Sequence, residues 1–335
     1  MWRLMPDPST PPVHHRRWAV TGATGLLGNN LVRTLANAGA DVRVLARGKN
    51  RRELEGVNVD VVEGDLDNVD ALRRCFERAD VVVHAAAAAD IRYGRREEMA
   101  AINVGGTRNV VSAMPAGARL VHVSSVDGLG LRTLGQPADE ECAPKDSEGG
   151  VPYVDTKREA DRVVRAWGGD HVIVHPCLLL GPWDWKPSSG RMILAIARGL
   201  GRFPPTGGNN FVHAQDVVDG TIAAASGERG RAWILAGENL PYTEAWRRIA
   251  AIVGAPAPML TLPPLVGTLA AAGMDLARAV GVPEGADVNA ATTRMGFLPH
   301  YFDGSRARRE LGTGGRSWEA GVSEAWAWFQ AQRGD

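Results

Sequence analysis

Three glycines at a spacing of three residues constrain the fold of this chain more than any other feature. They lie in Thr21–Gly28 (TGATGLLG), which follows the apolar run Trp18–Val20 and opens an apolar helical pattern. In such a strand–turn–helix unit, Gly22 permits a tight turn, Gly25 lets the backbone approach a pyrophosphate, and Gly28 lets the helix pack on the strand. A pyrophosphate there would meet the positive end of the helix. The pattern therefore predicts a dinucleotide-binding α/β fold.

Strands and helices alternate along the first half of the chain. Apolar runs predict six strands, and the segments between them have helical patterns. This alternation is typical of a doubly wound parallel sheet with helices on both faces, in which ligands bind at the carboxyl ends of the strands. The strands are expected near residues 17–22, 41–46, 58–62, 80–84, 118–124 and 171–177.

The alternation ends after Cys177, which indicates a second unit. Segments rich in glycine, proline and tryptophan follow, and then short helices with proline turns. We therefore expect a Rossmann-type NAD(P)-binding domain with a smaller, discontinuous α/β substrate-binding lobe. The expected division is 1–16 as a mobile extension without the apolar core of a signal peptide, 17–178 and 211–236 as the Rossmann domain, and 179–210 and 237–335 as the lobe.

Composition narrows the class of protein. Of the 335 residues, 44% are apolar, enough for a large core, and 38 basic residues balance 38 acidic ones. A net charge of zero gives no sign of a nucleic-acid surface. Cys75, Cys142 and Cys177 have neither disulfide nor metal spacing, so we expect a reducing, cytoplasmic location and no metal site. No apolar run reaches the roughly 18 residues of a membrane span.

Tyr153 and Lys157 form the clearest candidate catalytic pair. They stand four residues apart in the segment YVDTK, so on a helix they share one face. The lysine ammonium favours phenolate and is expected to lower the tyrosine pKa toward the working pH. Such a tyrosine can give a proton to a carbonyl oxygen or take one from an alcohol. Because the same spacing is common on solvated helices, the context of the pair decides its meaning.

Two polar residues supply that context. Ser125 follows the apolar strand that ends at Val123, at the sheet edge where ligands bind, although a serine there can also simply cap a turn. Asn103 lies within an expected helix, where asparagine is disfavoured unless its amide has a partner. It is either a surface residue or a buried amide that shapes the helix and holds a water near Lys157.

Taken in order, these motifs resemble those of the extended short-chain dehydrogenase/reductases, within the NAD-dependent epimerase/dehydratase superfamily. The resemblance runs from Arg17 to about Phe329 and is closest to the dihydroflavonol-4-reductase-like and 3β-hydroxysteroid dehydrogenase-like branch. The matching stretches are Thr21–Gly28, Glu63–Leu66, His84–Ala87, Asn103–Asn109, Ser124–Ser125 with Gly130, Tyr153–Lys157, Gly181–Pro182 and Phe211–Val217.

The resemblance implies a role for each matching residue. The catalytic residues would be Ser125, Tyr153, Lys157 and Asn103, with Lys157 also holding the nicotinamide ribose. The dinucleotide would contact Gly22, Thr24, Gly25, Leu26, Leu27, Arg47, Asp65, Leu66, His84, Ala85, Ala86, Lys157 and Pro176. The substrate would contact Ala87, Asp127, Cys177, Trp183 and Trp185. Asp65 would bind the adenine amine, unless it only caps a helix.

The preferred cofactor is predicted from the end of the second expected strand. Folds that bind NAD usually place an acid there for the ribose hydroxyls, but this chain has Ala46. Arg47 follows it, with Lys49, Arg51 and Arg52 close behind, and such a group of donors suits a 2′-phosphate. We therefore expect NADPH to be preferred, with NAD as the alternative. The other interpretation is a basic, solvated loop.

Departures from the family pattern bear on the substrate. Sugar-nucleotide epimerases of the family usually carry an asparagine after the sixth strand and an arginine before the Phe-Val-His segment. This chain has His175–Cys177 and Gly207–Asn210 at those two places. A diphosphate would therefore lack its usual bidentate partner, unless Lys186 or Arg191 replaces it.

Three candidate substrate contacts have two interpretations each. Asp127 is unusual so close to Ser125, and it is either a turn residue or a group that orients a polar substrate. Trp183 and Trp185 either pack in a loop or stack on a flat substrate.

Three functions remain open. The first is an NADPH-dependent carbonyl reductase, or alcohol dehydrogenase in reverse, acting on a hydrophobic cyclic or aromatic ketone. Hydride from nicotinamide C4 would reach the carbonyl carbon, Tyr153 would protonate the oxygen, and Ser125 would stabilise the alkoxide. The second is an NAD-dependent sugar-nucleotide epimerase or dehydratase with a tightly held cofactor. The third is a non-catalytic NAD(P)-sensing protein, which the intact Tyr153 and Lys157 disfavour.

The resemblance also implies a homodimer. Extended members of the family often pair through the helices after the fourth and fifth strands, here near 92–114 and 151–167. The two-fold contact would be self-complementary. The apolar residues Met99, Ile102, Val163 and Val164 are candidates for it, but each can equally face the protomer's own sheet.

Overall fold

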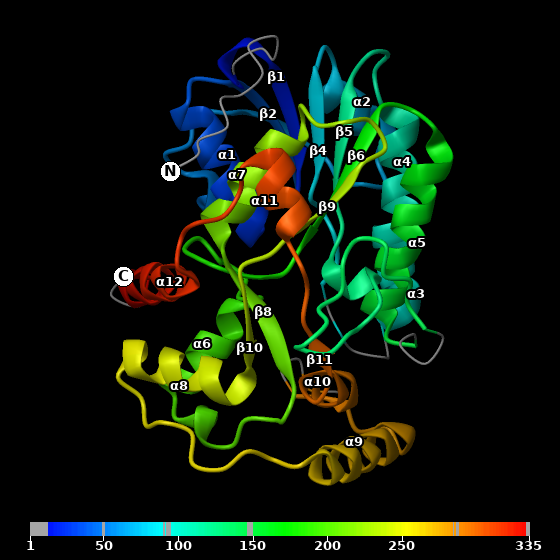
Figure 1. Ribbon diagram of the computed structural model, residues 1–335. Coiled ribbons are helices and arrows are strands. Elements are labelled where there is room, and N and C mark those ends of the chain that lie inside the picture. The colour runs from blue at the N-terminus through cyan, green and yellow to red at the C-terminus, as the bar shows by residue number, and fades with distance from the viewer. Residues whose placement is uncertain are drawn as a thin grey trace.

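A seven-stranded parallel sheet forms the larger part of the molecule. The computed structural model describes residues 13–48, 51–89, 91, 95–145, 150–283, 285 and 288–332. The strands are β1 (Arg17–Thr21), β2 (Asp41–Ala46), β3 (Asp60–Glu63), β4 (Val81–His84), β5 (Arg119–Val123), β6 (His171–Pro176) and β9 (Ala232–Leu235). Their order is β3-β2-β1-β4-β5-β6-β9, and helices cover both faces (Figure 1). The predicted Rossmann-type fold and all six predicted strands are confirmed, and β9 adds a seventh.

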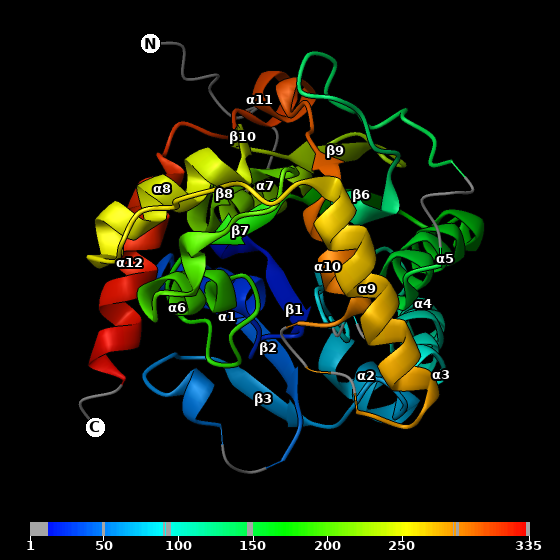
Figure 2. The same cartoon turned by 90° about the horizontal axis from the view of Figure 1, so that it is seen from below.

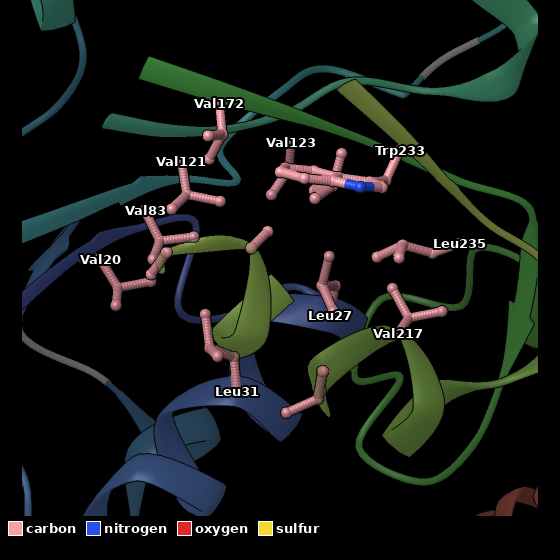
Figure 3. Packing of buried hydrophobic residues seen from close by; sticks show 14 of the residues in the cluster. Val20, Leu27, Leu31, Val83, Val121, Val123, Val172, Val217, Trp233 and Leu235 are labelled. Carbon is pink, nitrogen blue, oxygen red and sulfur yellow. The ribbon is translucent and has the colours of Figure 1, made fainter. Parts of the chain in front are cut away.

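The strands are near-continuous apolar runs because both faces of the sheet are buried. Every residue of β4 and β6 is buried. On one face, Val20, Val83 and Val121 from neighbouring strands lie side by side and pack against Leu27 and Leu31 of the following helix (Figure 3). This packing fixes the helix after the glycine turn against the strand before it, and so places the turn at the edge of the sheet.

Helices cover the sheet in two layers. They are α1 (Leu26–Asn37), α2 (Val69–Phe76), α3 (Arg96–Ala100), α4 (Gly106–Ala113), α5 (Pro152–Trp167) and α7 (Ala214–Ala224). Helices α1 and α7 pack on one face, whereas α2, α4 and α5 pack on the other (Figure 1). Between α3 and α4 the backbone makes a π-helical turn, η4 (Ala101–Gly105). Such turns are rare and often occur at functional sites.

A smaller sheet holds the second part of the molecule together. Its strands are β7 (Leu178–Leu180), β8 (Gly208–His213), β10 (Glu238–Pro241) and β11 (Pro299–His300), and β8 pairs with the other three. Helices α6 (Gly190–Ala197), α8 (Tyr242–Val253) and α12 (Trp318–Ala331) enclose an apolar cluster that includes Phe211, Ile249 and Val322. Helix α11 (Ser305–Leu311) instead packs beside β9 and α7. Short 3₁₀ helices are η1 (Val13–His15), η2 (Arg52–Leu54), η5 (Val126–Gly128) and η7 (Leu200–Arg202).

The division into a Rossmann domain and a substrate-binding lobe stays a prediction. Its expected boundary at residue 211 falls within β8, which pairs in the smaller sheet along its whole length. Within the expected segment 211–236, α7 packs on the large sheet and β9 pairs with β6 of that sheet.

Two further helices lie at the outer edge of the smaller sheet. They are α9 (Pro264–Ala279) and α10 (Ala290–Gly296), and α9 crosses the face of the molecule seen in Figure 2. Helix α9 exposes Leu265, Leu269 and Leu276, while Gly267 lies against the ring of Phe297. Among the described residues, no helix combines the length and the apolar content needed to cross a membrane.

Candidate active site

The glycine turn is fixed by close backbone contacts. Gly22 has a φ of +80°, and a Cβ there would lie 2.5 Å from the amide nitrogen of Ala86. A Cβ on Gly28 would lie 2.1 Å from the carbonyl oxygen of Gly22. The amide of Gly25 donates to that same oxygen at 3.0 Å. Only glycine fits at Gly22 and Gly28, because backbone atoms occupy the space that any side chain needs.

Gly25 differs from the other two glycines. A Cβ there would meet only the Gly22 oxygen, at 3.5 Å, so the space beside it is open. Gly25 is also the N-cap of α1 and provides no side-chain cap, which leaves the first amides of the helix available to an anion. Leu26 and Leu27 are the first two residues of α1, and both are buried. The residues present therefore fit the pyrophosphate of a dinucleotide, as predicted.

Ser125, Tyr153 and Lys157 meet at the carboxyl end of β5. Lys157 lies on α5, and its Nζ donates to the carbonyl oxygen of Val123 at 2.9 Å. Ser125 follows β5, and its side chain lies close enough to the phenol of Tyr153 to lower the pKa of that phenol. The structure thus brings together the three residues that the sequence predicts as a catalytic centre.

The pKa of Tyr153 differs from the prediction. Burial of the phenol raises its pKa above the ordinary value, and the carboxylate of Asp127 raises it further, while the hydrogen bond with Ser125 acts in the opposite direction. The predicted lowering by Lys157 is absent; the ammonium donates to a backbone carbonyl instead. Tyr153 is therefore protonated at neutral pH and is placed to act as a proton donor.

Lys157 keeps its charge in a buried place. Burial lowers its pKa to about 8, and the carboxylates of Asp161 and Asp127 limit that fall. Its side chain is only 5% exposed. The ammonium is therefore still mostly protonated at neutral pH, and it loses its proton in the mildly alkaline range.

Asn103 is a buried connector, not a surface residue. It is 2% exposed and lies in the π-helical turn η4. Its Oδ1 accepts from the amide of Ala88 at 2.7 Å, and its Nδ2 donates to Thr156 Oγ1 at 3.0 Å. Thr156 in turn donates to the carbonyl oxygen of Tyr153 at 3.1 Å. Asn103 thus ties the segment after β4 to the start of the catalytic helix; the water predicted near Lys157 stays a prediction.

His84 belongs to a second buried chain of hydrogen bonds. Its Nδ1 lies 2.8 Å from Thr21 Oγ1, and its Nε2 lies 3.1 Å from Thr107 Oγ1. Thr107 donates to the carbonyl oxygen of Asn103 at 2.6 Å. Burial holds the pKa of His84 well below its ordinary value, so the ring is neutral. These contacts give His84 a structural role, and its predicted contact with the dinucleotide stays a prediction.

The segment after β4 lies against the glycine turn. The amide of Ala85 donates to the carbonyl oxygen of Thr21 at 3.1 Å, and the amide of Ala86 to Thr21 Oγ1 at 3.4 Å. Ala87 continues this segment, and Thr24 lies within the turn. Their predicted ligand contacts therefore fall at the same edge of the sheet as the open space beside Gly25.

The basic residues after β2 follow the carboxyl end of that strand, at the same edge of the large sheet. Arg47 is 72% exposed in its side chain, and its Nη1 lies 3.6 Å from Asp65 Oδ2. Asp65 does not cap α2, because Asn68 is the cap of that helix. Arg51 pairs with Glu63 at 3.5 Å. Lys49 is outside the described residues. Arg47 and Asp65 are thus paired and accessible at the predicted site of the adenine and its ribose.

Asp127 lies beside the predicted catalytic residue Ser125. Its Oδ2 accepts from Ser125 Oγ at 3.2 Å, and its Oδ1 lies 3.8 Å from His300 Nε2. His300 comes from β11 of the smaller sheet and is buried. Cys177 is buried too, and burial, aided by the charge of Asp127, raises its thiol pKa well above the ordinary value. Pro176 ends β6 just before it.

Trp183 and Trp185 lie in a separate aromatic cluster with Trp328 of α12. The guanidinium of Arg33 stacks 3.5 Å from the centre of the Trp183 ring, and that of Arg52 lies 5.1 Å from the Trp185 ring. These contacts support the packing interpretation, and contact of either tryptophan with a substrate stays a prediction.

Sequence reasoning missed four residues of the centre. Thr107 and Thr156 complete the hydrogen bonds of His84 and Asn103, and Asp161 lies beneath Lys157. Thr107 stands four residues after Asn103, and Asp161 four residues after Lys157, so the helical spacing of the sequence holds a signal for both. His300 has no such signal, because it reaches the site from another sheet.

A dinucleotide turn and a Ser–Tyr–Lys centre at one edge of a parallel sheet define an NAD(P)-dependent oxidoreductase of the extended short-chain dehydrogenase/reductase type. The family model of the NAD dependent epimerase/dehydratase family matches residues 18–236, and the chain belongs to that family.

Named relatives and solved structures agree with this class. Sterol demethylase protein B of Methylococcus capsulatus is 36% identical over 320 residues, which are 93% of this chain and 97% of the relative. A putative dihydroflavonol 4-reductase of Synechocystis is 33% identical over 93% of this chain and 94% of its own length. The crystal structure of PA4631, described as a nucleoside-diphosphate-sugar epimerase from Pseudomonas aeruginosa, superposes with a TM-score of 0.75 and 26% identity, covering 95% of this chain and 98% of that one.

Proposed function

We propose that the protein is an NADPH-dependent carbonyl reductase, or alcohol dehydrogenase in reverse, acting on a hydrophobic cyclic or aromatic ketone. The observation that carries the proposal is the protonated phenol of Tyr153 beside Ser125, since carbonyl reduction needs a proton donor at the substrate oxygen. Relatives named as a putative dihydroflavonol 4-reductase and a 2-alkyl-3-oxoalkanoate reductase support the choice of a ketone.

The bound dinucleotide would supply the hydride. Tyr153 gives its proton to the carbonyl oxygen, and Ser125 donates a hydrogen bond to the same oxygen as charge develops there. A serine hydroxyl has one proton, so Ser125 must turn from Asp127 to the substrate to do this. Lys157 would hold the nicotinamide ribose, and its ammonium is fixed by donating to the carbonyl oxygen of Val123.

The alternative is an NAD-dependent sugar-nucleotide epimerase or dehydratase, which the similarity to the PA4631 structure favours. Such an enzyme needs a cation for the diphosphate. The segment 204–210 before Phe211 contains no arginine or lysine. Of the two substitutes, Lys186 lies 3.7 Å from Glu53, and Arg191 donates to the carbonyl oxygen of Ser188. Both are already engaged, which supports the reductase.

Oxidation of NADPH and NADH, followed across matched panels of ketones and sugar nucleotides, tests the proposal. We expect NADPH-dependent reduction of cyclic or aromatic ketones and no turnover of sugar nucleotides. Conversion of a UDP- or dTDP-sugar by protein that carries bound NAD, without ketone reduction, would establish the alternative instead.

Arg47 is expected to set the cofactor preference. If its guanidinium pairs with the 2′-phosphate, NADPH should bind roughly ten- to a hundredfold more tightly than NADH, the effect of a charge-assisted contact of about 1.5–3 kcal/mol. Arg47→Ala should remove most of that difference and leave NADH affinity nearly unchanged. Because Arg47 is largely exposed, added salt should also reduce the difference. Fluorescence titrations at low and high salt measure both effects.

Arg73→Ala is a matched control for that experiment. Arg73 is also an exposed arginine paired with an aspartate, but it lies on α2. The variant should keep the preference for NADPH. Wild-type protein that binds both dinucleotides equally at low salt would show that the basic residues after β2 form only a solvated loop.

We also propose a homodimer in a reducing, cytoplasmic environment. The three cysteines are free and buried, which supports that location. Of the four candidate contacts, Met99 and Val164 are buried within the protomer, so an interface through η4 and α5 would have to use residues such as Ile102 and Val163. Sedimentation of dilute protein should give the mass of a dimer. A monomer with full activity would contradict the proposal.

A further inference from the structure

A group of buried ionisable residues lies beneath the catalytic centre and has no part in the steps above. Asp161 stands on α5, one helical turn after Lys157 and two turns after Tyr153, on the same face. Its Oδ1 lies 3.2 Å from Nε2 of His122 on β5, and its Oδ2 lies 3.9 Å from Nε2 of His175 on β6. The side chains of both histidines are at most 2% exposed, and that of Asp161 is 13% exposed.

This group is joined to the catalytic centre on two sides. His175 contacts the carbonyl oxygen of Ser125 through its Nδ1 at 3.1 Å. His122 is the residue before Val123, whose carbonyl oxygen holds the Lys157 ammonium. The carboxylate of Asp161 is therefore fixed by the same two strands that fix Ser125 and Lys157.

We propose that Asp161 is a positioning residue for Lys157: its carboxylate, held one turn away on the same helix and braced by His122, keeps the ammonium protonated and bonded to Val123. A buried ammonium loses stability relative to the neutral amine, and an anion nearby restores it. The inference requires that Lys157 serve the dinucleotide site; it does not require any particular substrate.

The ionisation of these groups supports this arrangement. Burial raises the pKa of Asp161, but the rings of His122 and His175 beside it bring the pKa to about 2, so the carboxyl is ionised at working pH. Burial lowers the pKa of His122, so at neutral pH that ring is neutral and does not cancel the negative charge of Asp161. Asp161 is the strongest of the charges that hold up the pKa of Lys157.

The charged and titratable groups around Lys157 come from five elements. Two of these groups lie on α5 with Lys157, and the other four lie on three strands and on the turn after β5. They are Tyr153 and Asp161 on α5, His84 on β4, His122 on β5, Asp127 on η5 and His175 on β6. The two carboxylates are the groups that favour the ammonium, and Asp127 is also bonded to Ser125. Asp161 is thus the carboxylate that can be changed without removing a hydrogen bond from Ser125.

The test measures the titration of Lys157 itself. The chain has four lysines, Lys49, Lys145, Lys157 and Lys186, so trace acetylation with acetic anhydride at a series of pH values, read by peptide mass spectrometry, reports each one separately. In Asp161→Asn the midpoint of Lys157 should move to lower pH by about one unit or more, the usual effect of a nearby opposite charge. The alkaline limb of NADPH binding, followed by fluorescence, should move in the same direction.

Glu159→Gln is the matched control. Glu159 is on the same helix, and Glu159→Gln also removes one negative charge. The side chain of Glu159 is, however, 42% exposed and pairs with Arg162. It should leave the midpoint of Lys157 unchanged. Asp161→Glu, which keeps the charge, should stay closer to wild type than Asp161→Asn does.

Asp161→Ser provides a second removal of the charge should Asp161→Asn fail to fold, as circular dichroism would show. A Lys157 midpoint at the wild-type pH in a folded variant without the charge would overturn the proposal. Neither readout uses a ketone, so absence of ketone reduction would refute the proposed function and leave this inference intact.

Discussion

Replacing Tyr153 by phenylalanine is expected to lower the rate of ketone reduction by about 10²- to 10⁴-fold, the usual loss when a general acid is removed. The substitution deletes one hydroxyl and keeps the ring, so the fold and the affinity for the dinucleotide should survive. Steady-state kinetics of the wild type and the variant, with binding titrations alongside, measure both.

Tyr301→Phe is a control for this variant. It also deletes a tyrosine hydroxyl, but from the buried residue after β11 in the smaller sheet. It should have a much smaller effect on kcat. Near wild-type turnover by Tyr153→Phe would show that another group donates the proton.

The rate of ketone reduction should fall on the alkaline side of the pH profile in a single step near pH 8. Because the Tyr153 pKa is raised, the phenol keeps its proton through the mildly alkaline range. The ammonium of Lys157 does not, since its pKa is about 8. The rate of reduction should therefore decline as the pH rises through about 8, because Lys157 loses its proton there.

The second large effect is expected from the glycine turn. Gly25→Val should fill the open space beside the turn and weaken binding of the dinucleotide by well over about 1.4 kcal/mol, a tenfold change. Gly28→Val should instead unfold or strongly destabilise the protein, because its Cβ would lie 2.1 Å from a backbone oxygen. Thermal melts and NADPH titrations separate the two outcomes.

Gly273→Val on α9 is a control, since a Cβ there meets nothing within 4 Å. It should bind NADPH like the wild type and change the melting temperature only slightly. Unchanged affinity for the dinucleotide in both Gly25→Val and Gly28→Val would mean that the turn has only a structural role.

Local patterns in the sequence predict the large sheet well, because each of its strands is a short apolar run beside a helical pattern. They also predict Ser125, Tyr153 and Lys157, since the spacing of Tyr153 and Lys157 is a property of one helix. The groups that surround the Tyr153 phenol, Asp127 among them, are not a local property of its helix, and the predicted direction of its pKa shift was therefore wrong.

Contacts between distant segments set the rest of the site. Asp127 meets His300 because β11 reaches the centre from the smaller sheet, and no spacing in the sequence joins residues 173 positions apart. Trp183 and Trp185 had two interpretations, and their packing partner Trp328 comes from the distant helix α12. Both cases depend on how the second part of the chain folds back, which its proline-rich segments do not reveal.

The π-helical turn η4 limits how this part of the chain can change in length. A π turn holds one residue more than an α turn, so deletion of Ala101 would let α3 and α4 join as one regular helix. The turn would tighten, and the side chains within it would change direction. Asn103 would leave Ala88 and Thr156, and the catalytic helix would lose its anchor. This segment should therefore accept many substitutions at its exposed positions but no insertion or deletion.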